Sequence, residues 1–215
     1  MNSLESINRR IPYYSVLLHQ KLNDSLSMIL EQVLEHNKKF VEDKAYEPFR
    51  SDKYPQKKVA ILTCMDTRLV ELLPAAMGYK NGDVKVIKNA GGIISHPYGS
   101  VIRSLIIAIY KLGVSAVWVV GHTDCGMENL NVKELLKRIS ERGISDEVIK
   151  NIAGSGIDYE KWLGGFDCPR NAILQTMEQI RNHPLIPNDI LIEGMLMNST
   201  TGELTLVKDL KATIR

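Results

Sequence analysis

The sequence predicts an α/β fold with a mainly parallel central β-sheet flanked by helices. Short apolar runs of strand length alternate with longer stretches of helical periodicity, which is typical of right-handed βαβ units. A strand is predicted at 114–120, where the apolar run 116–120 suits a strand covered on both faces. Near the end of the chain, the polar loop 198–202 leads into the apolar segment 204–207, which predicts an antiparallel C-terminal edge strand.

The remaining elements follow from the same periodicities. The expected strands are 58–62, 84–87, 114–120, 189–197 and 204–207. The expected helices of this part of the chain are 69–77, 98–112, 131–142, 146–152, 158–163 and 169–182. Gly113 suits the C-cap of the second helix, and Pro169 suits the first turn of the last one.

An N-terminal helical extension precedes the sheet. Apolar residues between Leu26 and Val41 recur at helical intervals, and Asn23 or Asp24 is the expected N-cap. We therefore expect residues 1–56 to form a helical extension with its connection, and residues 57–215 to form the α/β domain. The apolar stripe of the extension could cover that domain or a second subunit, and the sequence leaves both possibilities open.

Composition excludes several classes of function. The net charge of +2 and the aromatic content of 6% give no basic or stacking surface for nucleic acid. No apolar run reaches the roughly 18–20 residues that a membrane span needs, and the N-terminus lacks the features of a signal peptide. Three cysteines are an odd count without the spacing of a disulfide framework, so a reducing, cytoplasmic location is expected.

Potential metal ligands gather after two of the predicted strands. Cys64 follows the strand at 58–62, and His122 and Cys125 follow the strand at 114–120. Functional groups in an open parallel sheet collect at the carboxyl ends of the strands, so these three side chains can converge if the strands are neighbours. Two sulfurs and one nitrogen suit Zn²⁺, and three protein ligands leave one coordination position for water or substrate.

The alternative is that both cysteines are small buried hydrophobes and His122 is an ordinary core residue. That interpretation would be preferred for any one of them alone, but their joint placement favours a metal site. A redox pair is less favoured because no Cys-x-x-Cys motif is present, and Cys168 is expected to be a passive thiol. Neither G-x-G-x-x-G nor a P-loop occurs, so no cofactor other than the metal is expected.

The combined pattern resembles the β-class carbonic anhydrase family. It consists of Cys64-x-Asp66-x-Arg68, the segment 89–92 and His122-x-x-Cys125. The resemblance implies a zinc lyase that reversibly hydrates CO₂ to bicarbonate and a proton, with zinc held by Cys64, His122 and Cys125. It also implies that Asp66 orients the zinc-bound hydroxide while Arg68 holds Asp66, and that Asp66 itself can bind zinc in a closed, inactive form.

Two thiolates neutralise the charge of Zn²⁺, so its bound water should be less acidic than in a site of three imidazoles, where the pKa is about 7. Activity is therefore expected to rise above neutral pH. The alternatives are a CS₂ or COS hydrolase built on the same zinc core, and a non-catalytic zinc- or bicarbonate-binding protein. The resemblance further implies a homodimer or a larger homo-oligomer.

Overall fold

The computed structural model describes the backbone of residues 13–208 and the side chains of residues 22–208. The chain divides into two compact units, Met1–Arg50 and Ser51–Arg215. No helix in the described part of the chain is both long enough and apolar enough to cross a membrane.

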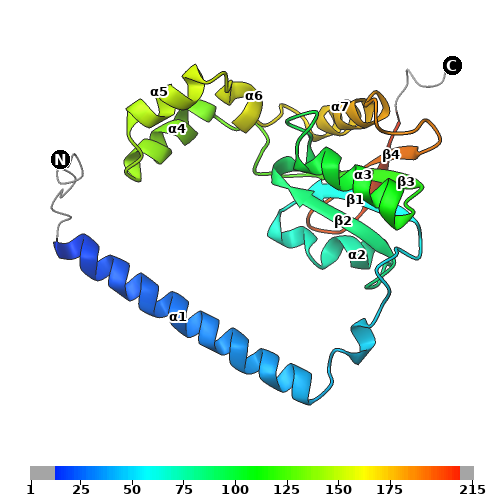
Figure 1. Cartoon of the computed structure of the whole chain (residues 1–215), viewed down its shortest axis with the longest axis horizontal. Coiled ribbons are helices and arrows are strands. Elements are labelled where there is room, and N and C mark those ends of the chain that lie inside the picture. Colours follow the sequence, from blue (N-terminus) through cyan, green and yellow to red (C-terminus); the bar gives the residue numbers. More distant parts are fainter. Residues whose placement is uncertain (1–12, 209–215) are drawn as a thin grey trace, which may run out of the picture. The chain divides into compact units, whose positions relative to one another are not determined.

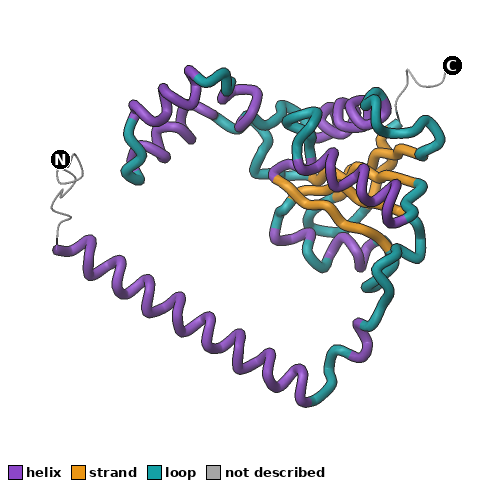
Figure 2. Tube along the Cα trace, viewed as in Figure 1, coloured by secondary structure: helices purple, strands orange, loops and turns teal. Residues whose placement is uncertain are grey.

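The second unit is built on one five-stranded sheet (Figures 1 and 2). Its strands are β1 (Val59–Cys64), β2 (Val84–Asn89), β3 (Ala116–His122), β4 (Leu191–Met197) and β5 (Leu204–Val207). They lie in the order β2-β1-β3-β4-β5, in which the first four are parallel and β5 pairs antiparallel with β4. The predicted α/β fold with an antiparallel C-terminal edge strand is confirmed.

Helices cover both faces of this sheet. On one face lie α3 (Ser100–Leu112) and α7 (Pro169–Arg181), and on the other lies α2 (Leu72–Ala76). The helices α4 (Val132–Glu141), α5 (Asp146–Gly154) and α6 (Tyr159–Leu163) come between β3 and α7 in the chain and form a group apart from the sheet (Figure 1). Successive side chains of a strand point to opposite faces, so Ala60 and Leu62 of β1 pack with α3 and α7. Val59 and Ile61 pack instead with the segment that contains α2. The two central strands β1 and β3 are therefore buried between two layers of apolar side chains.

The carboxyl ends of β1 and β3 lie side by side. These strands pair in parallel, with Thr63 opposite Val120. Cys64 and His122 were expected just past the strand ends, but each is the last residue of its strand. Backbone pairing continues beyond the apolar run, since the N–H of Met65 donates to the carbonyl of Asn89 at 2.8 Å. Side-chain hydropathy marks only the apolar part of a strand, whereas backbone hydrogen bonds decide where the strand ends.

The first unit contains α1 (Tyr13–Glu42) and a short 3₁₀ turn. The predicted cap at Asn23 or Asp24 was wrong, because both residues lie inside α1. Residues 13–42 contain no glycine or proline, so nothing interrupts the helix at that point. Among the described side chains of α1, which begin at residue 22, the exposed large apolar ones are Leu22, Leu26, Met28, Ile29, Leu30, Val33, Leu34 and Val41.

Candidate metal centre

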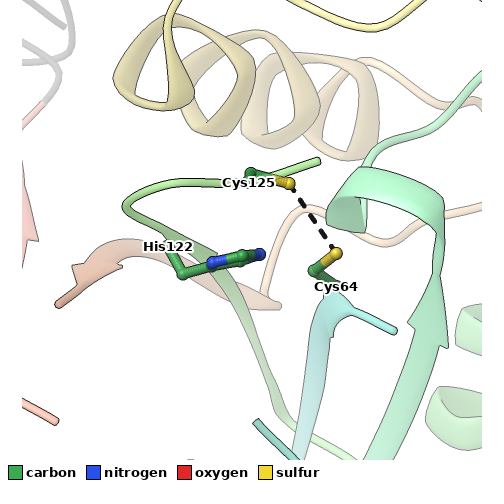
Figure 3. A group of neighbouring side chains, drawn as sticks. All are labelled: Cys64, His122 and Cys125. Atoms are coloured by element: carbon green, nitrogen blue, oxygen red, sulfur yellow. Dashed lines mark hydrogen bonds between the residues drawn. The ribbon is translucent and has the colours of Figure 1, made fainter. Parts of the chain in front are cut away.

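Three side chains from two segments, the end of β1 and the end of β3 with the turn after it, converge at the carboxyl edge of the sheet. Each of Cys64, His122 and Cys125 offers one ligand atom, and these atoms lie within 4.8 Å of one another (Figure 3). All three residues are buried, and the two Sγ atoms are 3.8 Å apart as free thiols. The arrangement is a Cys-His-Cys metal site.

The backbone positions each ligand differently. Cys64 ends β1 and His122 ends β3, so the pairing of these strands fixes two of the three ligands. Cys125 lies in the segment after β3, before a turn, and α4 begins only at Val132. The turn is closed by a hydrogen bond from the N–H of Glu128 to the carbonyl of Cys125 at 3.0 Å.

Gly92 allows the loop after β2 to pass directly against the end of β1. Its φ of +65° lies in the left-handed region, and a Cβ there would lie 2.9 Å from the carbonyl carbon of Thr63 and 3.0 Å from the nitrogen of Cys64. Both atoms are backbone and have little freedom to move. Gly92 therefore makes a close turn against the strand end that carries Cys64.

The chemistry of the donor set fits a cation. His122 Nδ1 lies 2.9 Å from the carbonyl oxygen of Thr123, which makes Nδ1 the protonated nitrogen and leaves the lone pair on Nε2. Nε2 is buried and has no hydrogen-bond partner among the described residues. A buried polar atom without a partner is costly, and a metal ion would satisfy it. Two thiols and this imidazole match the preferences of Zn²⁺.

The two thiols differ in acidity. Burial by itself would raise the pKa of Cys64, but the His122 imidazole and the backbone of Asp66 and Gly91 outweigh it and lower the pKa to about 7. Burial and the neighbouring Cys64 raise the pKa of Cys125 to about 11. Near neutral pH, one thiolate is therefore already available, and the second forms when a cation displaces its proton.

Asp66 and Arg68 form a close ion pair beside this site. Arg68 donates from Nε to Asp66 Oδ1 at 3.0 Å and from Nη2 to Asp66 Oδ2 at 2.8 Å. These bonds hold the pKa of Asp66 at about 2, so its carboxylate is ionised at all moderate pH values. Asp66 Oδ2 also lies 3.9 Å from His122 Nε2, which places it next to the metal ligands.

Sequence reasoning missed Asp124. Arg68 also donates from Nη1 to Asp124 Oδ2 and from Nη2 to the Asp124 carbonyl, both at 2.8 Å. The available signal was the position of an acidic residue directly before Cys125 within the second motif. Cys168 takes no part in the ligand group and is the N-cap residue of α7.

A cavity of about 380 Å³ is lined by residues that neighbour the metal-site segments in the chain, and none of the three ligands lines it. Asn89 and Ala90, which line it, belong to the segment paired with the end of β1, and Met127 lies two residues after Cys125. Trp162 also lines this cavity and is 52% exposed.

Comparisons with known proteins agree on one family. A family model described as "Carbonic anhydrase" matches residues 59–204. The chain is 47% identical over 178 residues to "Putative carbonic anhydrase YvdA" of Bacillus subtilis (strain 168), covering 83% of this chain and 90% of that protein. It is 31% identical over 160 residues to a carbon disulfide hydrolase of Acidianus sp. (strain A1-3), covering 69% and 76% of the two chains. The crystal structure of β-carbonic anhydrase isoform I from Trichomonas vaginalis superposes with a TM-score of 0.76 at 35% identity, covering 84% of this chain and 97% of that one.

Proposed function

Because the chain belongs to the β-class carbonic anhydrase family, we propose that it catalyses the reversible hydration of CO₂ to bicarbonate and a proton. The observation that carries this proposal is the arrangement of three ligands with a carboxylate held beside them. A structural zinc site normally takes a fourth protein ligand, whereas Arg68 holds Asp66 away from that role.

We assign the metal to zinc, with Cys64, His122 and Cys125 as its ligands. A zinc ion bound there would lower the pKa of a water molecule and so supply the nucleophile for CO₂. Asp66, kept ionised by Arg68, would accept a hydrogen bond from that nucleophile and orient it towards the substrate. The cavity lined by Asn89, Ala90 and Met127 would admit the substrate.

Hydrolysis of CS₂ or COS is the second candidate. It is supported by relatives named carbon disulfide hydrolase, which are 28–31% identical to this chain. Two relatives from Bacillus subtilis whose printed names begin "Putative carbonic anhydrase" are 47% and 45% identical over similar or longer stretches. We therefore favour CO₂ over CS₂ and COS as the proposed substrate. A non-catalytic zinc protein is least favoured, because it would not need the Asp66–Arg68 pair.

The test is stopped-flow CO₂ hydration at about pH 7 and about pH 8.5, with the zinc content of the same sample determined. Two thiolates neutralise the metal charge and make its water less acidic, so we expect turnover to rise at the higher pH. An equal rate at both pH values, in buffer that does not limit proton removal, would contradict this account. If the protein contains about one zinc per chain but does not hydrate CO₂ at either pH, CS₂ and COS are the next substrates to test.

A further inference from the structure

The Arg68 guanidinium joins two acidic residues on opposite sides. Asp66 takes the edge formed by Nε and Nη2, while Asp124 takes Nη1 through its carboxylate and a second hydrogen of Nη2 through its backbone carbonyl. A guanidinium has five N–H donors in a fixed planar fork, so these contacts use four of them. The Arg68 guanidinium presents two donors to Asp66. Asp124 therefore helps to fix the plane of this guanidinium.

The conformation of Asp124 is suited to this contact. Its φ of 53° lies in the left-handed region, which aspartate tolerates better than most residues. Its backbone carbonyl and its carboxylate both accept hydrogen bonds from Arg68 in this conformation. The Asp124 side chain is 85% exposed, whereas that of Asp66 is 15% exposed. Arg68 thus connects an outer carboxylate to an inner one.

We propose that Asp124 is a positioning residue that fixes the Arg68 guanidinium and so keeps Asp66 from binding the metal. Asp66 Oδ2 lies only 3.9 Å from His122 Nε2, so a small rotation would bring this carboxylate to a cation held by the ligands. The Arg68 side chain is 39% exposed and, without Asp124, could turn towards solvent and release Asp66. This proposal rests on one part of the proposed function, which is that Cys64, His122 and Cys125 bind a metal ion.

Energetics distinguish this role from simple stabilisation. An ion pair as exposed as Arg68–Asp124 contributes little to folding stability, so its loss should hardly change the melting temperature. Its loss should instead change whether a carboxylate or an added anion occupies the open coordination position. That occupancy can be measured without any catalytic assay.

The experiment measures azide binding to the Co²⁺-substituted protein by visible absorption. Asp124→Gly removes the carboxylate but keeps the left-handed backbone and its carbonyl, because glycine adopts positive φ freely. If Asp66 then competes for the metal, azide should bind roughly three- to tenfold more weakly. Asp124→Asn, which keeps an oxygen acceptor and tolerates the same backbone, should show a smaller change in the same direction and serves if the glycine variant binds no cobalt.

The matched control is the same pair of substitutions in a D66N background. Removing the negative charge of Asp124 would by itself strengthen anion binding, which is opposite to the expected change. The expected result is weaker azide binding in the presence of Asp66 and no weakening in D66N, at equal cobalt content. Equal shifts in both backgrounds, or no shift in either, would overturn the proposal. If the unaltered zinc protein did not hydrate CO₂ but azide binding still depended on both Asp124 and Asp66 in this way, only the proposed function would be contradicted.

Discussion

His122 carries the clearest residue-level sign of a missing partner, since its buried Nε2 has none among the described residues. The surrounding thiols hold their protons unequally, with pKa values of about 7 for Cys64 and about 11 for Cys125. Metal binding at this site is therefore coupled to proton release.

We predict that zinc affinity rises with pH. Between about pH 8 and pH 10, Cys125 still carries its proton while Cys64 has lost its own, so each zinc should displace about one proton. Below about pH 7 the slope should steepen, because Cys64 becomes protonated as well. Competition with a chromophoric chelator across this range measures the slope. A Cys125→Ser variant should bind zinc much more weakly, and a wild-type affinity independent of pH would refute the prediction.

Asp66 should matter for turnover and not for metal retention. Asp66→Asn keeps the size of the side chain but removes the charge that Arg68 holds, so we expect one zinc per chain and turnover lower by about 100-fold. Metal analysis and stopped-flow assays on the same sample measure both quantities. Loss of zinc from the variant would mean that Asp66 has a structural role.

At the scale of elements, the site depends on how closely the loop after β2 approaches the end of β1. Gly92 and Gly78 offer a matched comparison, because their φ values are +65° and +66°. A Cβ at Gly92 would collide with the backbone of Thr63 and Cys64, whereas a Cβ at Gly78 would meet nothing within 4 Å.

We therefore predict different effects of alanine at these two glycines. Gly78→Ala should lower the free energy of unfolding by about 1 kcal/mol, the cost of the left-handed conformation alone. Gly92→Ala should lower it by about 3 kcal/mol and weaken zinc binding as well, because the end of β1 must shift. Urea unfolding with metal analysis measures both effects. Equal losses in the two variants would show that the close approach is unimportant.

At the scale of the whole molecule, the apolar side chains of α1 are the surface on which we base a prediction of an oligomer. Leu30 and Leu34 are each 60% exposed in the single chain, at positions one helical turn apart. An exposed stripe of this kind usually marks an interaction site. The division proposed from the sequence, 1–56 and 57–215, gives this helix to the extension and leaves the metal site wholly in the α/β domain.

We predict a homodimer at least, with a mass of two or more 24.2-kDa chains in light scattering. The double substitution Leu30→Glu with Leu34→Glu should shift the protein towards monomer, because it places charge in the apolar stripe. Glu31→Lys changes a charge on the same helix outside that stripe and should leave the mass unchanged. A wild-type monomer at micromolar concentration would refute the prediction.

The sequence by itself determined the parts that depend on local periodicity and residue chemistry. Strand and helix periods predicted the α/β fold, and the donor types of Cys64, His122 and Cys125 predicted a zinc-type site. These features are readable because each depends on neighbours only a few residues away, or on chemistry that belongs to the side chain itself.

Only the tertiary structure decided which distant groups meet. The pairing of β1 with β3 brings Cys64 to His122, and the turn at Asp124 brings a second carboxylate to Arg68, 56 residues away in the sequence. The tertiary structure also places Cys64 and His122 within their strands. In addition, α1 begins before the expected cap at Asn23 or Asp24. Backbone hydrogen bonds and long-range contacts set these positions, and no local pattern of hydropathy records them.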